Sequence, residues 1–148
     1  MELRPFKPSD LDALYAIDRA CFPPGVSYSR EELGRFIQHR KARTWVAEAD
    51  GEIIGFLVAT VERDGVAHIV TVDVVREWRR RAAGSRLMAA AESWAGEQGC
   101  ALVVLETAED NLAAQAFYRR RGYSRLRRVA NYYPNHRAAW IMAKQLEG

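Results

Sequence analysis

Apolar residues recur along this chain in two rhythms. Spacings of three and four residues, which are typical of amphipathic helices, occur in four segments. Short runs rich in β-branched residues and bounded by turn signals occur in seven others and predict strands. The predicted helices begin at residues 11, 30, 83 and 112 and end near 21, 37, 97 and 121, and the predicted strands cover residues 2–5, 44–49, 53–61, 68–75, 101–106, 123–129 and 138–144.

Capping and turn residues mark the ends of these elements. Ser29 and Glu32 form a capping-box pair at the start of the second helix. The Ser-Asp pair at 9–10 precedes the first helix, and Gly122 ends the last one. The Asp-Gly pair at 50–51 is a strong hairpin signal between two strands. In chain order the elements are therefore β-α-α-β-β-β-α-β-α-β-β.

This order predicts an α/β protein whose helices pack against a mixed sheet. A chain of 148 residues is long enough for one hydrophobic core and too short for two, so we expect a single domain over residues 1–148. The 49% of hydrophobic and 28% of charged residues are ordinary for a soluble globular protein. The N-terminus has no apolar signal region, and we expect a cytoplasmic monomer or weak homodimer.

Positive charge is concentrated in the second half of the chain. Eleven arginines lie between residues 76 and 128 against six acidic residues, although the net charge of the whole chain is only +3. Such a region attracts nucleic acid, a membrane surface or a polyanionic cofactor. The arginines follow no nucleic-acid-binding motif and no apolar run approaches transmembrane length, so we expect neither nucleic acid nor membrane as a partner. Cys21 and Cys100 lack ligand-like neighbours, and we expect no metal.

The junction between the strand at 68–75 and the helix from residue 83 has the features of a phosphate site. A strand that enters a helix through a small, Arg-rich turn directs free backbone N–H groups and the positive end of the helix dipole at one point. The turn, residues 79–84, reads Arg-Arg-Arg-Ala-Ala-Gly. A solvated arginine cluster at a helix start is the alternative interpretation of these six residues.

The same turn resembles the acetyl-CoA pyrophosphate loop of the GCN5-related N-acetyltransferases, usually written Q/R-x-x-G-x-G/A. Arg79 and Gly84 match, whereas Ala82 stands where the family normally has glycine. We expect the methyl group of Ala82 either to crowd the phosphate or to force a different backbone angle, because glycine allows close approach. The resemblance implies that acetyl-CoA is held by Val72, Val74, Arg79, Arg80, Arg81, Ala82, Ala83, Gly84, Ser85, Asn111 and Tyr118.

Two later segments extend the resemblance. Leu105-Glu106, Asn111 and residues 116–123 resemble the family's L-E-V-x-x-x-N … A-x-x-L/F-Y-x-x-x-G-F segment. The Asn-Tyr-Tyr-Pro of residues 131–134 and the Ile-Met of 141–142 resemble the C-terminal signature of the ribosomal-protein N-terminal alanine acetyltransferases. The resemblance implies the fold of this family and an acetyl-CoA-dependent enzyme that acetylates a protein or peptide N-terminal amine by direct attack.

Direct transfer needs a neutral amine, stabilisation of the thioester oxygen and a proton for the departing thiolate. Backbone N–H groups near residues 72–74 can meet the oxygen where that strand leaves its neighbour. The resemblance points to Tyr132 as the proton donor and to Tyr118 as the second candidate, and a phenol with a pKa of about 10 suits a thiolate. The alternative makes Tyr118 a core aromatic and Tyr132 a stacked loop aromatic.

The motif does not supply the residue that takes the amine proton. The alanine acetyltransferases carry a glutamate after the helix tyrosine, and here that position is Arg119, which cannot accept a proton. Glu106 is one candidate, because a carboxylate in an apolar strand is costly without a task or a partner; pairing with an arginine is its alternative. His68, at the predicted start of a strand, is another if its imidazole is neutral, and a plain surface histidine is its alternative.

Residues 22–28, Phe-Pro-Pro-Gly-Val-Ser-Tyr, form a turn segment with aromatic and small apolar side chains. The corresponding loop lines the peptide groove of N-terminal acetyltransferases, so the resemblance implies a substrate site formed by Phe22, Val26, Tyr28, Tyr132 and Tyr133. Such side chains accept a short first residue and exclude a long one. Hydrophobic stapling of two helices explains the same segment equally well.

Three departures from the family pattern leave other functions open. Residues 135–140 replace an acidic stretch that usually follows the Asn-Tyr-Tyr-Pro motif, which leaves the substrate open. A small-molecule amine, such as a polyamine, an amino acid or an antibiotic, is the alternative substrate. Ala82 and Arg119 also keep open a non-catalytic module that binds acyl-CoA or nucleic acid.

Overall fold

The computed structural model describes residues 1–147. Within that range seven strands form one mixed sheet in the order β1-β2-β3-β4-β5-β7-β6, so the predicted α/β class is confirmed. The strands are β1 (Glu2–Pro5), β2 (Ala42–Ala49), β3 (Glu52–Arg63), β4 (Val66–Val74), β5 (Leu102–Ala108), β6 (Ser124–Val129) and β7 (Ala139–Gln145). The helices are α1 (Leu11–Cys21), α2 (Arg30–Gln38), α3 (Ala83–Glu97) and α4 (Leu112–Arg120), with short 3-10 turns η1 (Pro8–Asp10) and η2 (Arg76–Trp78).

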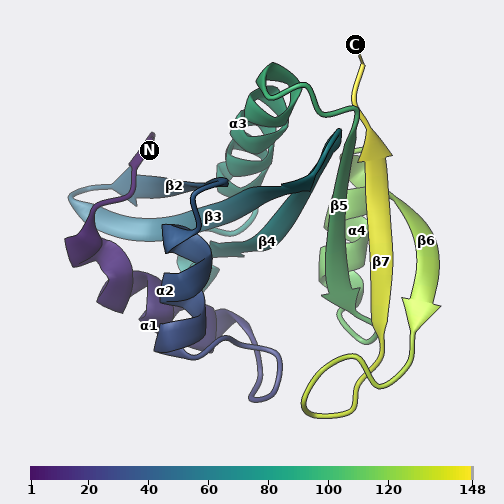
Figure 1. The fold of residues 1–148 in the computed structure, drawn as a ribbon. Helices are drawn as coiled ribbons and strands as arrows, with labels where there is room; N and C mark the ends of the chain where they lie inside the picture. The colour runs from purple at the N-terminus through teal and green to yellow at the C-terminus, as the bar shows by residue number, and fades with distance from the viewer. Residues whose placement is uncertain (148) are drawn as a thin grey trace.

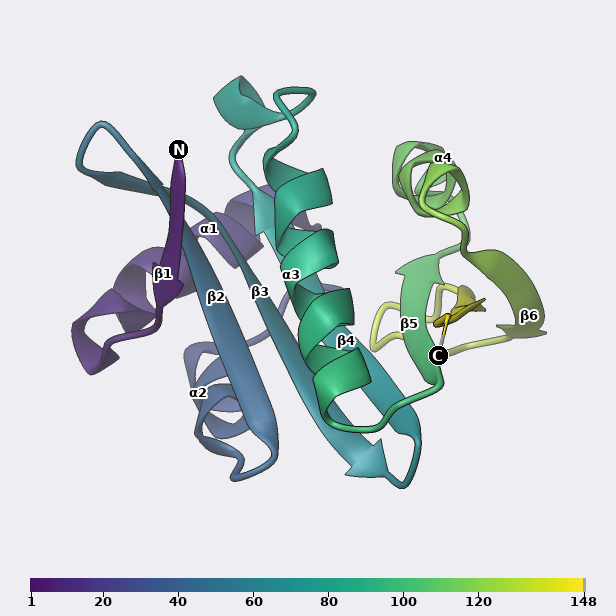
Figure 2. The same ribbon diagram turned by 90° about the horizontal axis from the view of Figure 1, so that it is seen from above.

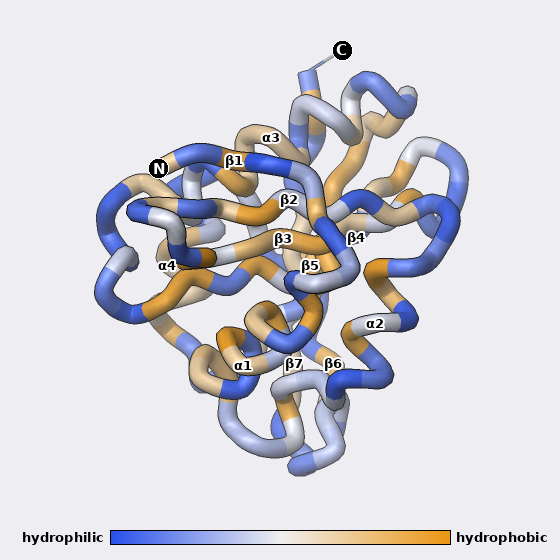
Figure 3. Tube along the Cα trace, turned by 90° about the vertical axis from the view of Figure 1, so that its left-hand side faces the viewer, coloured by the Kyte–Doolittle hydropathy of each residue, from blue (hydrophilic) through white to orange (hydrophobic). Residues whose placement is uncertain are grey.

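Helices cover both faces of the sheet (Figures 1 and 2). α1 and α2 lie on one face, and α3 and α4 lie on the other. Strand β3 is buried on both sides, because Phe56 and Val58 pack with α1 and α2 whereas Leu57 and Ala59 pack with α3. A strand buried on both faces has an almost continuous apolar sequence. Hydrophobic stretches accordingly run along the central strands in Figure 3.

None of the helices in residues 1–147 is both long and apolar enough to cross a bilayer.

Three local features differ from the sequence prediction. Turn η2 was not predicted. Strand β4 starts at Val66, so His68 lies inside the strand and not at its start. Asp10 does not cap α1 with its side chain, because its carboxylate accepts hydrogen bonds from Arg4 and from the backbone N–H of Lys7. These differences move element ends by one or two residues and leave the element order unchanged.

The feature of the sheet that creates a site is the divergence of β4 from β5. The two parallel strands pair only at residues 66–68 and 102–104. Beyond His68, β4 continues along β3 and β5 continues along β7, which opens the V-shaped gap between the two halves of the sheet in Figure 1. A shift in the β3–β4 register leaves Val70 as an extra residue at this point. Such a bulge bends its strand.

Candidate active site

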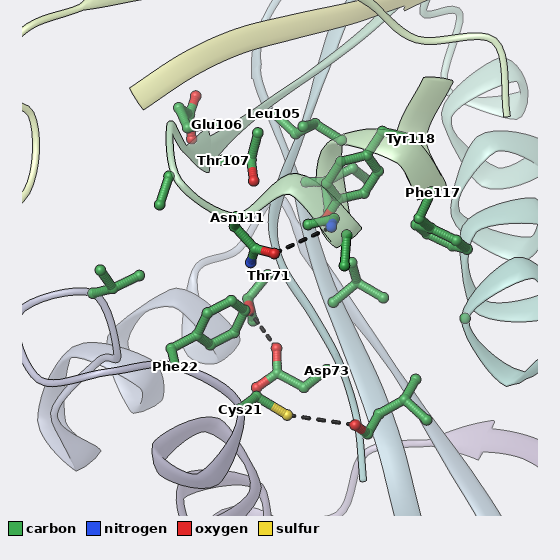
Figure 4. Close-up of a pocket in the computed structure, with 18 of the residues that line it drawn as sticks. Cys21, Phe22, Thr71, Asp73, Leu105, Glu106, Thr107, Asn111, Phe117 and Tyr118 are labelled. Carbon is green, nitrogen blue, oxygen red and sulfur yellow. Dashed lines mark hydrogen bonds between the residues drawn. The ribbon is translucent and has the colours of Figure 1, made fainter. Parts of the chain in front are cut away.

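A cavity of about 880 Å³ occupies the fork between β4 and β5. Its walls come from the α1–α2 loop (residues 22–29), β4, the turn before α3, the end of β5 with the start of α4, and the β6–β7 loop (residues 130–138). Figure 4 shows Cys21 and Phe22 on one side of this cavity and Asn111 and Tyr118 on the other. Segments that are far apart in the sequence therefore converge on the fork.

The turn before α3 lies at one end of this cavity and has the features of an anion site. The backbone N–H of Arg86 is bonded to the carbonyl of Ala82, so the N–H groups of residues 83–85 precede the first intrahelical bond and are free for a ligand. Gly84 and Ser85 line the cavity, as do Arg79 and Arg80. The first turn of α3 contains no acidic residue. Free N–H groups, the helix dipole and two guanidinium groups together suit a pyrophosphate.

The backbone φ angle of Ala82 lies in the left-handed region, which glycine favours. This angle is +64°, and Arg80 has the same value. A residue with a side chain pays about 1–2 kcal/mol for this conformation. Both expectations for Ala82, a crowded phosphate and an altered backbone angle, stay predictions. The turn keeps its left-handed geometry with some strain.

Helix α4 supports the turn from the other side of the fork. A Cβ added to Gly84 would lie 3.2 Å from Cζ of Phe117, so the small residue at 84 lets α3 and α4 approach each other. Asn111 caps α4, because its Oδ1 accepts a hydrogen bond of 3.1 Å from the backbone N–H of Ala114 (Figure 4). This confirms the predicted helix start. Asn111 also lines the cavity.

A cluster of ionisable side chains lies where the two strands separate. Oε1 of Glu106 is 2.7 Å from Nε2 of His68, and Nδ1 of the same ring is 3.0 Å from Oε1 of Glu62. Glu106 lines the cavity, whereas His68 lies behind it. Burial alone lowers the pKa of His68, but the hydrogen bond and charge of Glu106, together with those of Glu62, outweigh burial and raise that pKa. The two carboxylates therefore shift the ring towards the imidazolium form.

Four tyrosines line the same cavity, and a raised pKa keeps the phenols of three of them, Tyr118, Tyr132 and Tyr133, protonated. Burial is the main cause that raises the pKa of Tyr118, with the charges of Asp73 and Glu106 adding to it. Burial, the charges of Glu106 and Glu62 and a hydrogen bond to Glu106 raise the pKa of Tyr132 to about 12. Tyr133, whose ring stands edge-on 4.8 Å from that of Tyr132, has its pKa raised mainly by burial. A phenol that stays protonated can donate to a departing anion.

Comparison with known proteins decides the family. Residues 11–123 match the acetyltransferase (GNAT) family. The chain belongs to the GNAT acetyltransferases. An uncharacterised N-acetyltransferase of Methanocaldococcus jannaschii is 30% identical over 146 residues, which cover 98% of this chain and 92% of the relative. An N-alpha-acetyltransferase of Sulfurisphaera tokodaii is 26% identical over 159 residues, which cover 93% of this chain and 89% of the relative.

Solved structures show the same fold. The ribosomal-protein-S18-alanine N-acetyltransferase from Escherichia coli superposes with a TM-score of 0.87 at 22% identity, covering 99% of this chain and 96% of the bacterial enzyme. The resemblance drawn from residues 79–84 and 105–142 is thereby confirmed at the level of the family and fold. GNAT enzymes use acetyl-CoA, so the protein is an acetyl-CoA-dependent N-acetyltransferase. The fork and the anion-binding turn suit that cosubstrate.

Most residues expected to hold acetyl-CoA line the acetyltransferase's cavity, but two do not. Arg81 stacks on the ring of Trp78, with its guanidinium carbon 5.1 Å from the ring centroid. Ala83 is buried beneath the turn and belongs to the hydrophobic core. Neither side chain is part of the cavity lining in the described chain. The residues that do line it are Val72, Val74, Arg79, Arg80, Ala82, Gly84, Ser85, Asn111 and Tyr118.

The residues expected to bind substrate also line the cavity, and Tyr28 has an additional structural task. Its hydroxyl donates to the carbonyl of Val70 over 3.3 Å, and its ring packs edge-on against Phe36 of α2 at 5.2 Å. These contacts hold the α1–α2 loop against the bulge of β4. Tyr28 therefore both packs against α2 and lines the cavity. The remaining members of the expected substrate set are Phe22, Val26, Tyr132 and Tyr133.

Arg119, the departure that raised doubt about catalysis, points away from the site. It is exposed on the last turn of α4 and is absent from the cavity lining within residues 1–147. Glu106 is hydrogen-bonded to His68, and the arginine partner of the alternative interpretation is not found among the hydrogen bonds of the described chain. The change at 119 therefore does not alter the groups that face the fork.

Sequence reasoning missed a buried pair of carboxyl groups beside the cavity. Asp73 of β4 accepts a 2.5 Å hydrogen bond from the hydroxyl of Thr71, and Asp18 of α1 accepts one of 2.8 Å from the backbone N–H of Tyr28. Burial, followed by the facing Asp18 carboxyl, raises the pKa of Asp73 well above its ordinary value. Oδ1 of Asp18 and Oδ2 of Asp73 have no donor among residues 1–147, and one shared proton would satisfy both. The signal was available, because Asp73 interrupts an apolar strand as Glu106 does.

Proposed function

We propose that this acetyltransferase acetylates the α-amine of a protein or peptide N-terminus. The observation that carries the proposal is the carboxylate of Glu106, which lines the cavity at the fork with His68 behind it and Tyr132 beside it. A carboxylate there can take the proton of an incoming ammonium group. The relative from Sulfurisphaera tokodaii, an N-alpha-acetyltransferase, supports an N-terminal amine as the acceptor.

The charges around the cavity favour a substrate with one amine over a polyamine. Three acidic residues line the cavity in the described chain. Asp73 is buried against Asp18, and Asp110 pairs with Arg137, which leaves Glu106 to meet an ammonium group. A polyamine would leave its further ammonium groups beside the arginines of the lining. Phe22, Val26 and Tyr133 instead offer apolar and aromatic surface to a short side chain.

The proposed reaction is a direct transfer. Acetyl-CoA supplies an activated thioester, and the turn before α3 binds its pyrophosphate. Glu106 takes a proton from the ammonium group, and the neutral nitrogen then attacks the thioester carbonyl carbon. Backbone N–H groups of β4 next to the Val70 bulge stabilise the negative oxygen. As the carbon–sulfur bond breaks, a tyrosine hydroxyl gives its proton to the thiolate, the nitrogen loses its second proton to the resulting tyrosinate, and Glu106 releases the first proton to solvent.

We assign this last proton to Tyr118 ahead of Tyr132, which reverses the order expected from the motif. Tyr118 comes from α4 next to Phe117, and it is Phe117 that lies against Gly84 of the turn. Tyr132 comes from the β6–β7 loop and contacts Glu106, on the side proposed for the amine. The tyrosine that lies nearer the turn is the better donor to the thiolate of CoA.

The test is the release of CoA from acetyl-CoA, followed with a thiol reagent over a panel of amines. The panel holds short peptides with free Ala, Ser or Met N-termini, the same peptides with acetylated N-termini, spermidine, lysine and an aminoglycoside. We expect turnover of free Ala and Ser N-termini and none of the acetylated peptides. Turnover restricted to the small amines would contradict an N-terminal substrate, and binding of acetyl-CoA without any turnover would contradict it as well.

A matched pair of variants tests Glu106. Glu106→Gln removes the proton acceptor with little change in shape, so kcat should fall about 100-fold. Glu97→Gln makes the same change at an exposed position of α3 and should leave kcat unchanged. Equal rates for the two variants would remove Glu106 from the reaction.

A further inference from the structure

A row of three side chains connects the cavity with bulk solvent. It consists of Glu106 on β5, His68 on β4 and Glu62 on β3, joined by contacts of 2.7 and 3.0 Å. The side chains of Glu106 and His68 are 19% and 15% exposed, whereas that of Glu62 is 57% exposed. Glu106 and His68 enter the proposed function, but Glu62 has no task there.

The register of the sheet explains why these residues meet. His68 pairs with Thr60 on β3 and with Val104 on β5. Glu62 and Glu106 each lie two residues further along their strands, on the same face because strand side chains alternate. Glu62 is also the extra residue of a bulge between Val61 and Arg63, and bulges redirect side chains.

The carboxylate of Glu62 is held against the ring although it is exposed. Its Oε1 accepts a hydrogen bond of 3.3 Å from the hydroxyl of Thr60 and faces Nδ1 of His68. With carboxylates at both nitrogens, the ring satisfies each of them only when both nitrogens carry hydrogen. One oxygen of Glu106 is then occupied by Nε2–H, which leaves the other oxygen for the substrate amine.

We propose that Glu62 is a positioning residue that acts through His68 to orient the carboxylate of Glu106. The inference rests on the proposed function, in which Glu106 accepts the amine proton. Glu62 does not line the cavity, and its contact with the row is through the far nitrogen of the ring. No proton needs to move along the row for this role.

Other groups around the pair do not replace Glu62. The charged groups that face His68 are Glu62 from β3 and Glu106 from β5. The phenols near Glu106 are Tyr28 from the α1–α2 loop, Tyr118 from α4, and Tyr132 and Tyr133 from the β6–β7 loop. They supply hydrogens or neutral surface, and none of them carries a negative charge at neutral pH. Removing the charge at 62 should therefore lower the pKa of His68.

The first measurement needs no substrate. NMR titration of the imidazole of His68 is compared between the wild type, Glu62→Gln and Glu52→Gln. Glutamine at 62 can still accept a hydrogen bond but has no charge, and Glu52 is an exposed glutamate at the other end of β3. We expect the pKa of His68 to fall by about 0.5 in Glu62→Gln, in line with a partly exposed ion pair, and to be unchanged in Glu52→Gln. Identical titrations would overturn the proposal.

The second measurement is the pH–rate profile on an amine that the enzyme turns over. Glu62→Gln should lower kcat by about two- to fivefold, move the limb governed by His68 to lower pH, and leave the KM of acetyl-CoA unchanged. A shifted titration with an unchanged pH–rate profile would show a structural link alone and would overturn the positioning role. A failure of the peptide panel leaves the titration intact, so the two proposals can fail separately.

Discussion

At the scale of residues, two carboxylates in apolar strands have opposite surroundings. Glu106 meets a hydrogen-bond donor, the ring of His68, and the phenol of Tyr132 lies close to it. Asp73 meets the carboxyl of Asp18, with burial as the larger cause of its raised pKa. An ionised carboxylate can serve as a base, whereas a carboxyl that keeps its proton serves as a hydrogen-bond donor. The neighbours therefore separate the reactive acid from the structural one.

The two tyrosines can be separated by their kinetic signatures. Tyr118→Phe should lower kcat about 100-fold, because it removes the proposed proton donor to the thiolate. Tyr132→Phe should mainly raise the KM of the peptide, since the lost hydroxyl contacts Glu106 on the amine side. Tyr15→Phe, which removes a hydroxyl bonded to Arg19 on α1, should change neither constant. A larger loss of kcat in Tyr132→Phe than in Tyr118→Phe would return the donor role to Tyr132.

At the scale of elements, the Asp18–Asp73 pair joins α1 to β4 and holds the α1–α2 loop through the N–H of Tyr28. The pKa of Asp73 in the folded protein lies above its value in the unfolded chain. The folded state therefore binds the proton more tightly, and the stability that this proton provides is present at low pH and is lost as pH rises from about 4 towards the folded pKa. The Asp18–Asp73 pair therefore contributes less to the stability of the fold once pH exceeds the folded pKa of Asp73.

Asparagine at position 73 should remove this dependence on pH. Its amide can donate to Asp18 at every pH while its oxygen still accepts from Thr71. Thermal unfolding should show Asp73→Asn close to the wild type at pH 4.5 and more stable at pH 8 by at least about 3 °C. Asp64→Asn, in an exposed turn, should follow the wild type at both values. A variant that is less stable than the wild type at pH 8 would rule out the shared proton.

The helices, strands and turns could be predicted from the sequence wherever neighbouring residues determine them. Ser29 with Glu32 and the Asp-Gly pair at 50–51 determine their own caps and turn, so the order of elements follows from the sequence. The divergence of β4 from β5 does not, because strand pairing depends on residues about 36 positions apart, as in His68 and Val104. A role for Glu62 could not be predicted from the sequence for the same reason. Its only signal is a register shift that appears after the sheet has formed.

At the scale of the whole molecule, the fork is closed by two loops from opposite ends of the chain. A three-residue ladder joins β4 to β5, and beyond it the two halves of the sheet separate. The α1–α2 loop belongs to the first half and the β6–β7 loop to the second. They meet at Asn135, whose Nδ2 donates to the carbonyl of Pro24 over 3.4 Å. The amine side of the cavity is therefore formed only when both halves are in place.

Gly25 is the residue that permits this contact, and alanine there tests the arrangement. Its φ is +88°, and an added Cβ would lie 2.6 Å from Cβ of Asn135, so the loops must move apart. We expect Gly25→Ala to raise the KM of the peptide about tenfold, because the groove widens, and to leave the KM of acetyl-CoA within about twofold. Gly51→Ala is the matched control, since Gly51 has φ +77° with nothing within 4 Å of an added Cβ. Gly51→Ala introduces the same kind of backbone strain without a steric clash. A similar rise in the KM of the peptide in that variant would attribute the effect to lost stability and not to the contact between the two loops.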